Sequence, residues 1–225
     1  GIMAGASILE TAVAPDSSLY PPVSAILEAS GKASQLTRQM LAYSGRGHFI
    51  VRPLCLATQV KQILALLHAS IPKQVQLNLD LDESEGTIEA DPGQLQQLVM
   101  NLVINAAEAI PAHGEVFVST SKIVLPEARQ TICSQLQSGE YVLLEVRDTG
   151  AGISEANRNR IFDPFFTTKF TGRGLGLSAV LGIIKGHRAG IEVESKPGVG
   201  TLFRVLFPST HAQVEDLEPV KSQMQ

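Results

Sequence analysis

The glycine-rich segment between residues 148 and 177 most constrains the fold of this chain. It begins with Asp148-Thr149-Gly150-Ala151-Gly152-Ile153, directly after a strand pattern. It ends with Gly172-Arg173-Gly174-Leu175-Gly176-Leu177, at the start of a helix pattern from Ser178 to His187. Glycines let the backbone approach a ligand closely, and a loop that opens a helix turns unpaired N–H groups toward an anion. Taken singly, the first motif also suits a surface turn and the second a flexible linker.

A helix predicted from Gln94 to Ile110 carries the second feature. It starts with a capping residue and a proline, Asp91-Pro92. At roughly 100° per residue its apolar side chains gather on one predicted core face: Leu95, Leu98, Val99, Leu102, Ala106 and Ala109. The opposite face carries Gln94, Gln97, Asn101, Asn105 and Glu108. Amide oxygens can ligate a hard cation and amide NH2 groups can donate to phosphate, whereas an ordinary solvated stripe is the alternative.

Between the two glycine motifs, the segment from Ile161 to Lys169 places three aromatic residues before two hydroxyls and a cation. The aromatic side chains are typical of packing, and the hydroxyls and the cation suit the binding of an anion. The spacing matches neither a P-loop nor a dinucleotide-binding fingerprint, because no Gly-Lys-Ser/Thr occurs and no strand directly precedes the glycines after it.

The remaining patterns predict a mixture of strands and helices. We expect a helix from Leu56 to Ala69 with Ile63, Leu64 and Leu67 inward, and a hairpin that pairs Val75–Leu79 with Thr87–Ala90. Further strands are expected at residues 49–53, 115–124, 141–147, 191–195 and 201–207, with a polar excursion between the second and third of these.

The first forty-odd residues predict two helices joined by a short turn. Ile2, Ala6, Leu9 and Val13 follow a helical seam, and Ile26 to Tyr43 repeat it, with Ser44–Gly47 as a hinge. A hairpin of this kind exposes an apolar stripe, which favours dimerisation into a four-helix bundle. Packing of the hairpin on its own downstream domain is the alternative.

Composition excludes several classes of protein. The 225 residues are 44% hydrophobic with a net charge of −4, which argues against a nucleic-acid-binding surface. Cys55 and Cys133 match no metal spacing and are expected to be reduced thiols in a cytoplasmic domain, whose parent protein could still be membrane-anchored. Gly1-Ile2-Met3-Ala4 resembles the middle of a helix, so we expect a fragment of a longer protein.

Together these segments resemble the ATP-binding domain of sensor histidine kinases, in the superfamily shared with gyrase, chaperone and mismatch-repair ATPases. The N box corresponds to residues 101–109, the G1 box to 148–152, the F box to 162–166 and the G2 box to 172–177. Gly198 to Phe203 also fits, and the resemblance covers Phe49 to Pro208. Residues 36–44 resemble the second dimerisation helix, particularly that of hybrid kinases.

The resemblance implies an α+β fold: a two-layer α/β sandwich of the Bergerat type, with a mixed sheet covered by helices on one face. It implies a partial dimerisation hairpin at residues 1–47, a catalytic domain at 48–208 and a polar tail at 209–225. It also implies a homodimer, a response-regulator receiver domain as partner, and binding of ATP with Mg²⁺.

The same resemblance assigns residues to the site. Asn105 would ligate Mg²⁺, Asp148 would accept from the adenine amino group, and Asn101 and Lys169 would act on the phosphates. Thr201 would support adenine through a water molecule. The full set implied to bind the nucleotide is Asn105, Glu108, Asp148, Gly150, Gly152, Ile153, Phe162, Phe166, Thr168, Lys169, Gly172, Arg173, Gly174, Leu175, Gly176, Leu177 and Thr201.

The residue at position 101 distinguishes a kinase from a hydrolase. Hydrolytic relatives carry a glutamate base there, and an asparagine cannot take a proton from water. Glu108 lies on the wrong turn to replace it. We therefore expect transfer to a histidine. An ATP-sensing degenerate kinase, a slow ATPase and a kinase of the mitochondrial dehydrogenase kind are the alternatives.

No histidine of the chain fits the acceptor pattern of a histidine on the first bundle helix. His48, His68, His113 and His211 fall in other contexts, and His187 is expected to have a structural role at a helix end. We expect the acceptor to lie upstream of Gly1, so that this chain does not phosphorylate itself. Arg188-Ala189-Gly190 stands where relatives often have consecutive glycines, and there we expect only a changed turn.

Overall fold

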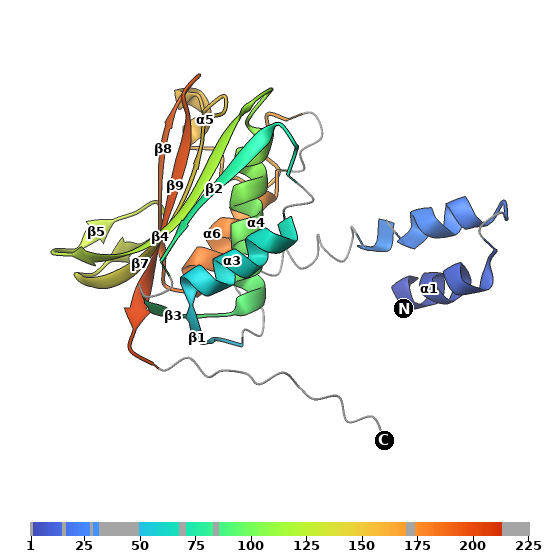
Figure 1. Ribbon diagram of the computed structural model, residues 1–225, viewed down its shortest axis with the longest axis horizontal. Coiled ribbons are helices and arrows are strands. Elements are labelled where there is room, and N and C mark those ends of the chain that lie inside the picture. The colour runs from blue at the N-terminus through green and yellow to red at the C-terminus, as the bar shows by residue number, and fades with distance from the viewer. Residues whose placement is uncertain are drawn as a thin grey trace.

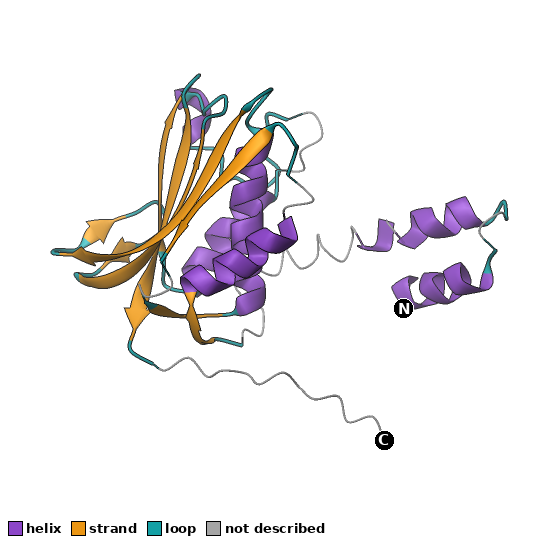
Figure 2. Cartoon of the chain, in the orientation of Figure 1, coloured by secondary structure: helices purple, strands orange, loops and turns teal. Residues whose placement is uncertain are grey.

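A mixed sheet with helices on one face forms the body of the computed structural model (Figures 1 and 2). The structure describes residues 2–14, 17–27, 29–31, 50–67, 71–82, 86–169 and 174–212. Within them the sheet has seven strands: β1 (Arg52–Cys55), β2 (Val75–Leu81), β3 (Thr87–Ala90), β4 (Gly114–Leu125), β7 (Gly139–Asp148), β8 (Gly190–Lys196) and β9 (Gly200–Thr210). Their order is β1-β3-β9-β7-β4-β2, and β8 also pairs with β9.

Three helices cover the sheet: α3 (Leu56–Leu67), α4 (Pro92–Glu108) and α6 (Gly176–Gly186). The short helix α5 (Glu155–Arg158) and a two-stranded sheet of β5 (Arg129–Gln130) and β6 (Gln135–Leu136) complete the domain. The predicted two-layer α/β sandwich is confirmed, and the polar excursion before β7 contains the β5–β6 pair.

The core lies between the sheet and the helices. Alternate residues of the central strands, such as Val142, Leu144 and Val146 of β7, meet the apolar face of α4 in one buried cluster. Of the predicted helix face, Leu95, Leu98, Val99, Leu102 and Ala106 are buried, together with Val103 and Ala107. Ala109 is half-buried, because α4 ends at Glu108.

The first turn of α4 is fixed by its capping residue. Asp91 Oδ1 accepts from the backbone N–H of Gln94 at 2.9 Å, and Pro92 takes the first helical position as predicted. Nε2 of His187 accepts from the backbone N–H of Asp91 at 3.0 Å, while its Nδ1 lies 2.8 Å from the carbonyl of Ile183. The ring therefore carries its proton on Nδ1 and joins the end of α6 to the start of α4. The predicted structural role of His187 is confirmed.

The predicted pairing of β2 with β3 is wrong. β2 instead pairs in parallel with β4, and β3 pairs antiparallel with β1 and β9. β3 leads directly into the cap of α4, and this cap is bound to the end of α6. The connection therefore holds β3 at the β1–β9 end of the sheet, away from β2.

The N-terminal segment is helical in its described part. α1 (Ile2–Ala12) and the helical residues 20–27 and 29–31 form an antiparallel hairpin (Figure 1). Ala6 and Val23 are buried, whereas Ile2, Ile8, Leu9, Leu19 and Ile26 are exposed. Of the other predicted seam residues, Val13 is half-buried and Ala29 is exposed. The seam beyond residue 31 and the hinge at Ser44–Gly47 lie outside the described residues.

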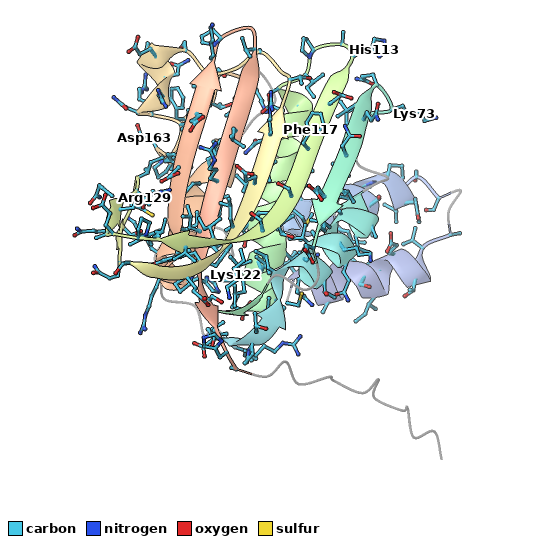
Figure 3. All side chains as sticks on the ribbon, turned by 60° about the vertical axis from the view of Figure 1, so that its left-hand side comes forward. Lys73, His113, Phe117, Lys122, Arg129 and Asp163 are labelled. Carbon is cyan, nitrogen blue, oxygen red and sulfur yellow. The ribbon has the colours of Figure 1, made fainter. Side chains whose placement is uncertain are left out.

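The face of the sheet opposite the helices is largely polar (Figure 3). Arg204 of β9 contacts both Glu145, at 2.8 Å, and Glu194. Phe117 of β4 is 37% exposed on this side, and the small cluster of Leu125, Leu136, Tyr141, Leu143 and Leu206 is covered near the β5–β6 pair. Within the part of the chain that the structure describes, no helix is both long and apolar enough to cross a membrane.

Candidate functional site

A cavity of about 410 Å³ brings the predicted motif segments together. Its walls come from α4, the end of β7, the start of β9, the segment Phe166–Lys169 and the first turn of α6. Most of the predicted site residues line it: Asn101, Asn105, Glu108, Asp148, Gly152, Ile153, Phe166, Thr168, Lys169, Gly174, Leu175, Gly176, Leu177 and Thr201. Segments separated by up to a hundred positions in the sequence thus form one site.

Two of the predicted residues that the structure describes are not among those lining this cavity. Phe162 is only 9% exposed and belongs to the core, with its outer edge at a different cavity beside β8. Gly150 packs against the end of α4, where a Cβ atom would lie 2.5 Å from the carbonyl oxygen of Ala109. Gly150 therefore has a packing role that only a residue without a side chain allows. Gly172 and Arg173 lie outside the described residues.

The sequence patterns also missed some lining residues. Ile104, Ala106, Ala109, Ile161, Thr167 and Phe203 line the cavity. Ile104, Ala106 and Ala109 lie inside the N box, Phe203 ends the stretch from Gly198, and Ile161 and Thr167 flank the F box. Their positions within or beside the motifs were the available signal.

Asp148 ends β7 at the closed end of the cavity and is 3% exposed. Its Oδ1 accepts from the backbone N–H of Gly150 at 2.8 Å and from that of Thr201 at 3.3 Å. Burial raises the pKa of this carboxyl, and the two backbone hydrogen bonds oppose that rise. No donor of the described residues reaches Oδ2, which leaves an acceptor for an exocyclic amine.

Two glycines let the loop after Asp148 lie against the β8–β9 hairpin. Gly152 has a φ of +69°, and a Cβ there would lie 2.2 Å from the carbonyl oxygen of Lys196. A Cβ at Gly200 would lie 2.0 Å from the carbonyl oxygen of Asp148. Any side chain at either position would push the two segments apart, so both glycines fix the floor of the cavity.

The two asparagines of α4 lie under the first turn of α6. Asn101 Nδ2 donates to the carbonyl oxygen of Gly176 at 3.2 Å, and the Cβ position of Gly176 lies 3.5 Å from Asn105 Nδ2. Leu175 at the N-cap of α6 provides no side-chain hydrogen bond to the helix. The first N–H groups of α6 are thus available beside two amides, an arrangement that suits a phosphate.

An ion pair crosses the other side of the cavity. Lys169 Nζ lies 2.7 Å from Glu108 Oε2, and both side chains are partly exposed. A pair of this exposure contributes at most about 1 kcal/mol, so an anion can displace the carboxylate from the ammonium group. Lys169 is therefore placed to meet a phosphate, with Glu108 as its partner in the structure.

A backbone hydrogen bond joins Phe165 to Gly174. The backbone N–H of Phe165 donates to the carbonyl oxygen of Gly174 at 2.8 Å, and both residues have positive φ, +67° and +66°. A Cβ at Gly174 would lie 2.4 Å from the carbonyl carbon of Phe165. The guanidinium of Arg160 lies over the ring of the neighbouring Phe166, 4.5 Å from the ring centre, in a cation–π contact.

The donor set suits a magnesium nucleotide better than a metal ion alone. Within the described residues no group of three or more His, Cys, Asp or Glu side chains could hold a metal. The side of the cavity formed by α4 offers amide oxygens from Asn101 and Asn105. Mg²⁺ is commonly held by few protein oxygens together with phosphate oxygens and water, and these residues fit that requirement.

The fold and the site define an ATP-binding domain with a mixed sheet, an amide-bearing helix and a glycine-rich loop. Residues 90–211 match the family model described as "Histidine kinase-, DNA gyrase B-, and HSP90-like ATPase". The chain belongs to this family.

Similar proteins are sensor kinases. Sensor kinase CckA of Brucella abortus is 36% identical over 191 residues, which are 84% of this chain and 20% of CckA. The catalytic domain of histidine kinase ThkA is 27% identical with a TM-score of 0.57, covering 71% of this chain and 95% of that one. Full-length ShkA in complex with AMPPNP shares the fold, with 23% identity and a TM-score of 0.71 over 95% of this chain and 43% of ShkA.

The chain corresponds to the ATP-binding catalytic part of these sensor kinases and spans about a fifth of the length of CckA. The expected family and fold are therefore confirmed.

Cys55 and Cys133 are both thiols, and burial raises the pKa of Cys133.

Proposed function

We propose that this chain binds ATP with Mg²⁺ in the cavity and supplies the γ-phosphoryl group to a histidine of the parent kinase. Asp148 and Thr201 would hold adenine, and Asn105 would hold Mg²⁺ through its amide oxygen. Asn101, Lys169 and the first N–H groups of α6 would hold the phosphates. Gly172 and Arg173 belong to the same proposal as part of the loop over the phosphates.

The carboxylates of the cavity support a kinase over a hydrolase. The carboxylate side chains among its lining residues are Asp148 and Glu108. Asp148 is engaged by two backbone N–H groups at the closed end, and Glu108 is paired with Lys169. Asp148 lies at the opposite end of the cavity from the phosphates, and Glu108 lies about two turns of α4 beyond position 101, where hydrolytic relatives carry the base. Neither is placed to take a proton from the attacking water, even when Glu108 is released from Lys169, so bound ATP should persist until a stronger nucleophile arrives.

The proposed step is an in-line displacement at the γ-phosphorus. A neutral imidazole nitrogen forms the new N–P bond, the bond between the γ-phosphorus and the β,γ-bridging oxygen breaks, and ADP leaves. The bound Mg²⁺ would neutralise charge on the phosphate oxygens. Lys169, released from Glu108, would stabilise charge on the transferred group, while Asn101 and the N–H groups of α6 orient it.

Two partners belong to the proposal. The exposed side chains of Ile2, Leu9 and Ile26 on the N-terminal hairpin support a homodimer, because a second hairpin would bury them in a four-helix bundle. The likeness to sensor kinases supports onward relay to a response-regulator aspartate, and ThkA has been solved in complex with response regulator protein TrrA.

The experiment supplies the acceptor separately. The chain is incubated with γ-labelled ATP, Mg²⁺ and a helical dimerisation domain that carries the acceptor histidine. We expect acid-labile label on that domain, none on its His→Gln variant, and none on this chain alone. Label that never leaves ATP would support an ATP-sensing module, and rapid phosphate release without acceptor would support an ATPase. Either result would overturn the proposed transfer.

A further inference from the structure

Ser195, near the end of β8, connects the elements that surround the base end of the cavity. It follows Ile191 and Val193 on the side of the sheet that faces the helices. Its Oγ accepts from the backbone N–H of Ile153 at 2.8 Å and donates to the carbonyl oxygen of Gly200 at 3.0 Å. The same oxygen lies 2.9 Å from Oγ1 of Thr201. Ser195 itself is not among the residues that line the cavity.

The proton count at Ser195 fixes the direction of the last contact. A serine hydroxyl has one proton, and the carbonyl oxygen of Gly200 can only accept one. All three contacts are satisfied when Ser195 donates to Gly200 and the hydroxyl of Thr201 donates to Ser195. Thr201 then presents only lone pairs to the cavity that it lines.

We infer that Ser195 is a positioning residue that makes Thr201 an acceptor and thereby selects a 6-amino over a 6-oxo purine. This inference rests on the proposed binding of ATP in the cavity. With Thr201 held in this way, the base end offers two acceptors, Asp148 Oδ2 and Thr201 Oγ1. A 6-amino group has two N–H donors for them, directly or through water. A 6-oxo group presents an acceptor to both and is rejected.

Replacing Ser195 should weaken this selection in a particular direction. In S195A the hydroxyl of Thr201 loses its acceptor and is able to rotate and donate into the cavity. The rotating hydroxyl can still accept from ATP, but it now also offers a donor to inosine triphosphate, which differs from ATP at the 6-oxo group and the N1 proton. Since a hydrogen bond changes affinity by roughly five- to tenfold, we expect the preference for ATP over inosine triphosphate to fall by about tenfold.

Calorimetric titration with ATP and with inosine triphosphate, each with Mg²⁺, tests the inference on the full chain. Ser134→Ala is the matched control, because Ser134 Oγ also donates to a backbone carbonyl, that of Ala189 at 2.9 Å, in a different part of the domain. It should leave the ratio of the two affinities unchanged, and Ser195→Thr, which keeps the hydroxyl, should retain the wild-type ratio. T201V should lower that ratio, and adding S195A to T201V should change it no further.

The outcomes separate the inference from the proposed function. A wild-type chain that binds neither nucleotide would overturn the proposed function. A wild-type chain that prefers ATP, with the same ratio in S195A, would overturn only the role of Ser195. An equal effect of S195A with and without Thr201 would also overturn it, because Ser195 would then not act through that hydroxyl. Should S195A fail to fold, an unchanged ratio in T201V alone would refute the inference.

Discussion

Replacement of Asp148 by asparagine separates the proposed base-binding role of this carboxyl from its role in the fold. Oδ1 of Asp148 accepts both backbone hydrogen bonds, from Gly150 and from Thr201. An asparagine can keep both with its amide oxygen. Its NH2 group then takes the place of Oδ2 and presents a donor to the adenine amino group. The variant should therefore fold normally and bind ATP poorly.

The magnitude follows from the bond that is lost. A hydrogen bond to a charged acceptor contributes about 1.5–3 kcal/mol, and about 1.4 kcal/mol is a factor of ten in affinity. We expect D148N to weaken ATP binding by roughly 10- to 150-fold. Stability should not fall, because burial raises the pKa of this carboxyl and the neutral amide avoids the cost of burying a charge.

Calorimetry with ATP and thermal unfolding without it measure the two effects separately. D148N should unfold at the same or a higher temperature than the wild type and gain little from added ATP. D148A is the contrasting variant: it leaves two buried N–H groups without an acceptor and should lower the unfolding temperature. An ATP affinity of D148N within about threefold of the wild type would refute the assignment of Asp148 to adenine.

Three further predictions follow from the structure. Because burial raises the pKa of Asp148, the ATP affinity measured by calorimetry between about pH 8 and pH 4 should fall as the pH decreases through that raised value, since the protonated oxygen accepts poorly. The fall should be smaller in D148N, which keeps only the titration of the phosphates and of other groups. Thr120→Val should raise the free energy of unfolding in denaturant by about 1 kcal/mol, because the hydroxyl of Thr120 is buried with no hydrogen-bond partner among the described residues, and an unchanged midpoint would contradict this. Arg188→Gly should raise the free energy of unfolding by up to about 1 kcal/mol in the same assay, because Arg188 has a strained φ of +53° at the end of α6. A less stable variant would show that the contacts of the Arg188 side chain contribute more than the strain costs.

The local features of the fold could be predicted from the sequence. The cap of α4 depends on Asp91 and the two residues that follow it, and the buried face of the helix depends on its own periodicity. The strands β7, β8 and β9 are recognised for the same reason, since alternation and glycines are local signals. A turn forms at Arg188, with Ala189 N–H donating to the carbonyl oxygen of Ile184 at 3.0 Å, and its difference from the turn of relatives stays a prediction.

Pairing between distant segments could not be predicted in this way. The alternation of β2 and β3 indicates two strands but does not specify their neighbours, and proximity in sequence wrongly favoured a hairpin. The places of Gly150 and Phe162 also depend on packing that the sequence does not specify. A motif shows that a residue type is required, but only the packing of Gly150 on Ala109 shows that the requirement comes from the fold. The 108–169 ion pair likewise joins side chains that no local pattern relates.

The attachments of α4 explain why the two ends of the cavity should respond differently to a nucleotide. At its start, the cap of α4 is bound to His187 at the end of α6. At its end, the carbonyl oxygen of Ala109 accepts from the backbone N–H of Ala151 at 2.9 Å, in the loop that follows Asp148. Packing and backbone hydrogen bonds thus set the separation between the two asparagines and Asp148, the proposed base-binding residue. On the phosphate side, by contrast, Lys169 is joined to α4 by an exposed ion pair that contributes little. Binding of a triphosphate should therefore move Lys169 and its neighbours while the end of the cavity at Asp148 keeps its geometry, because the parts of a structure that are held by weaker contacts rearrange most easily.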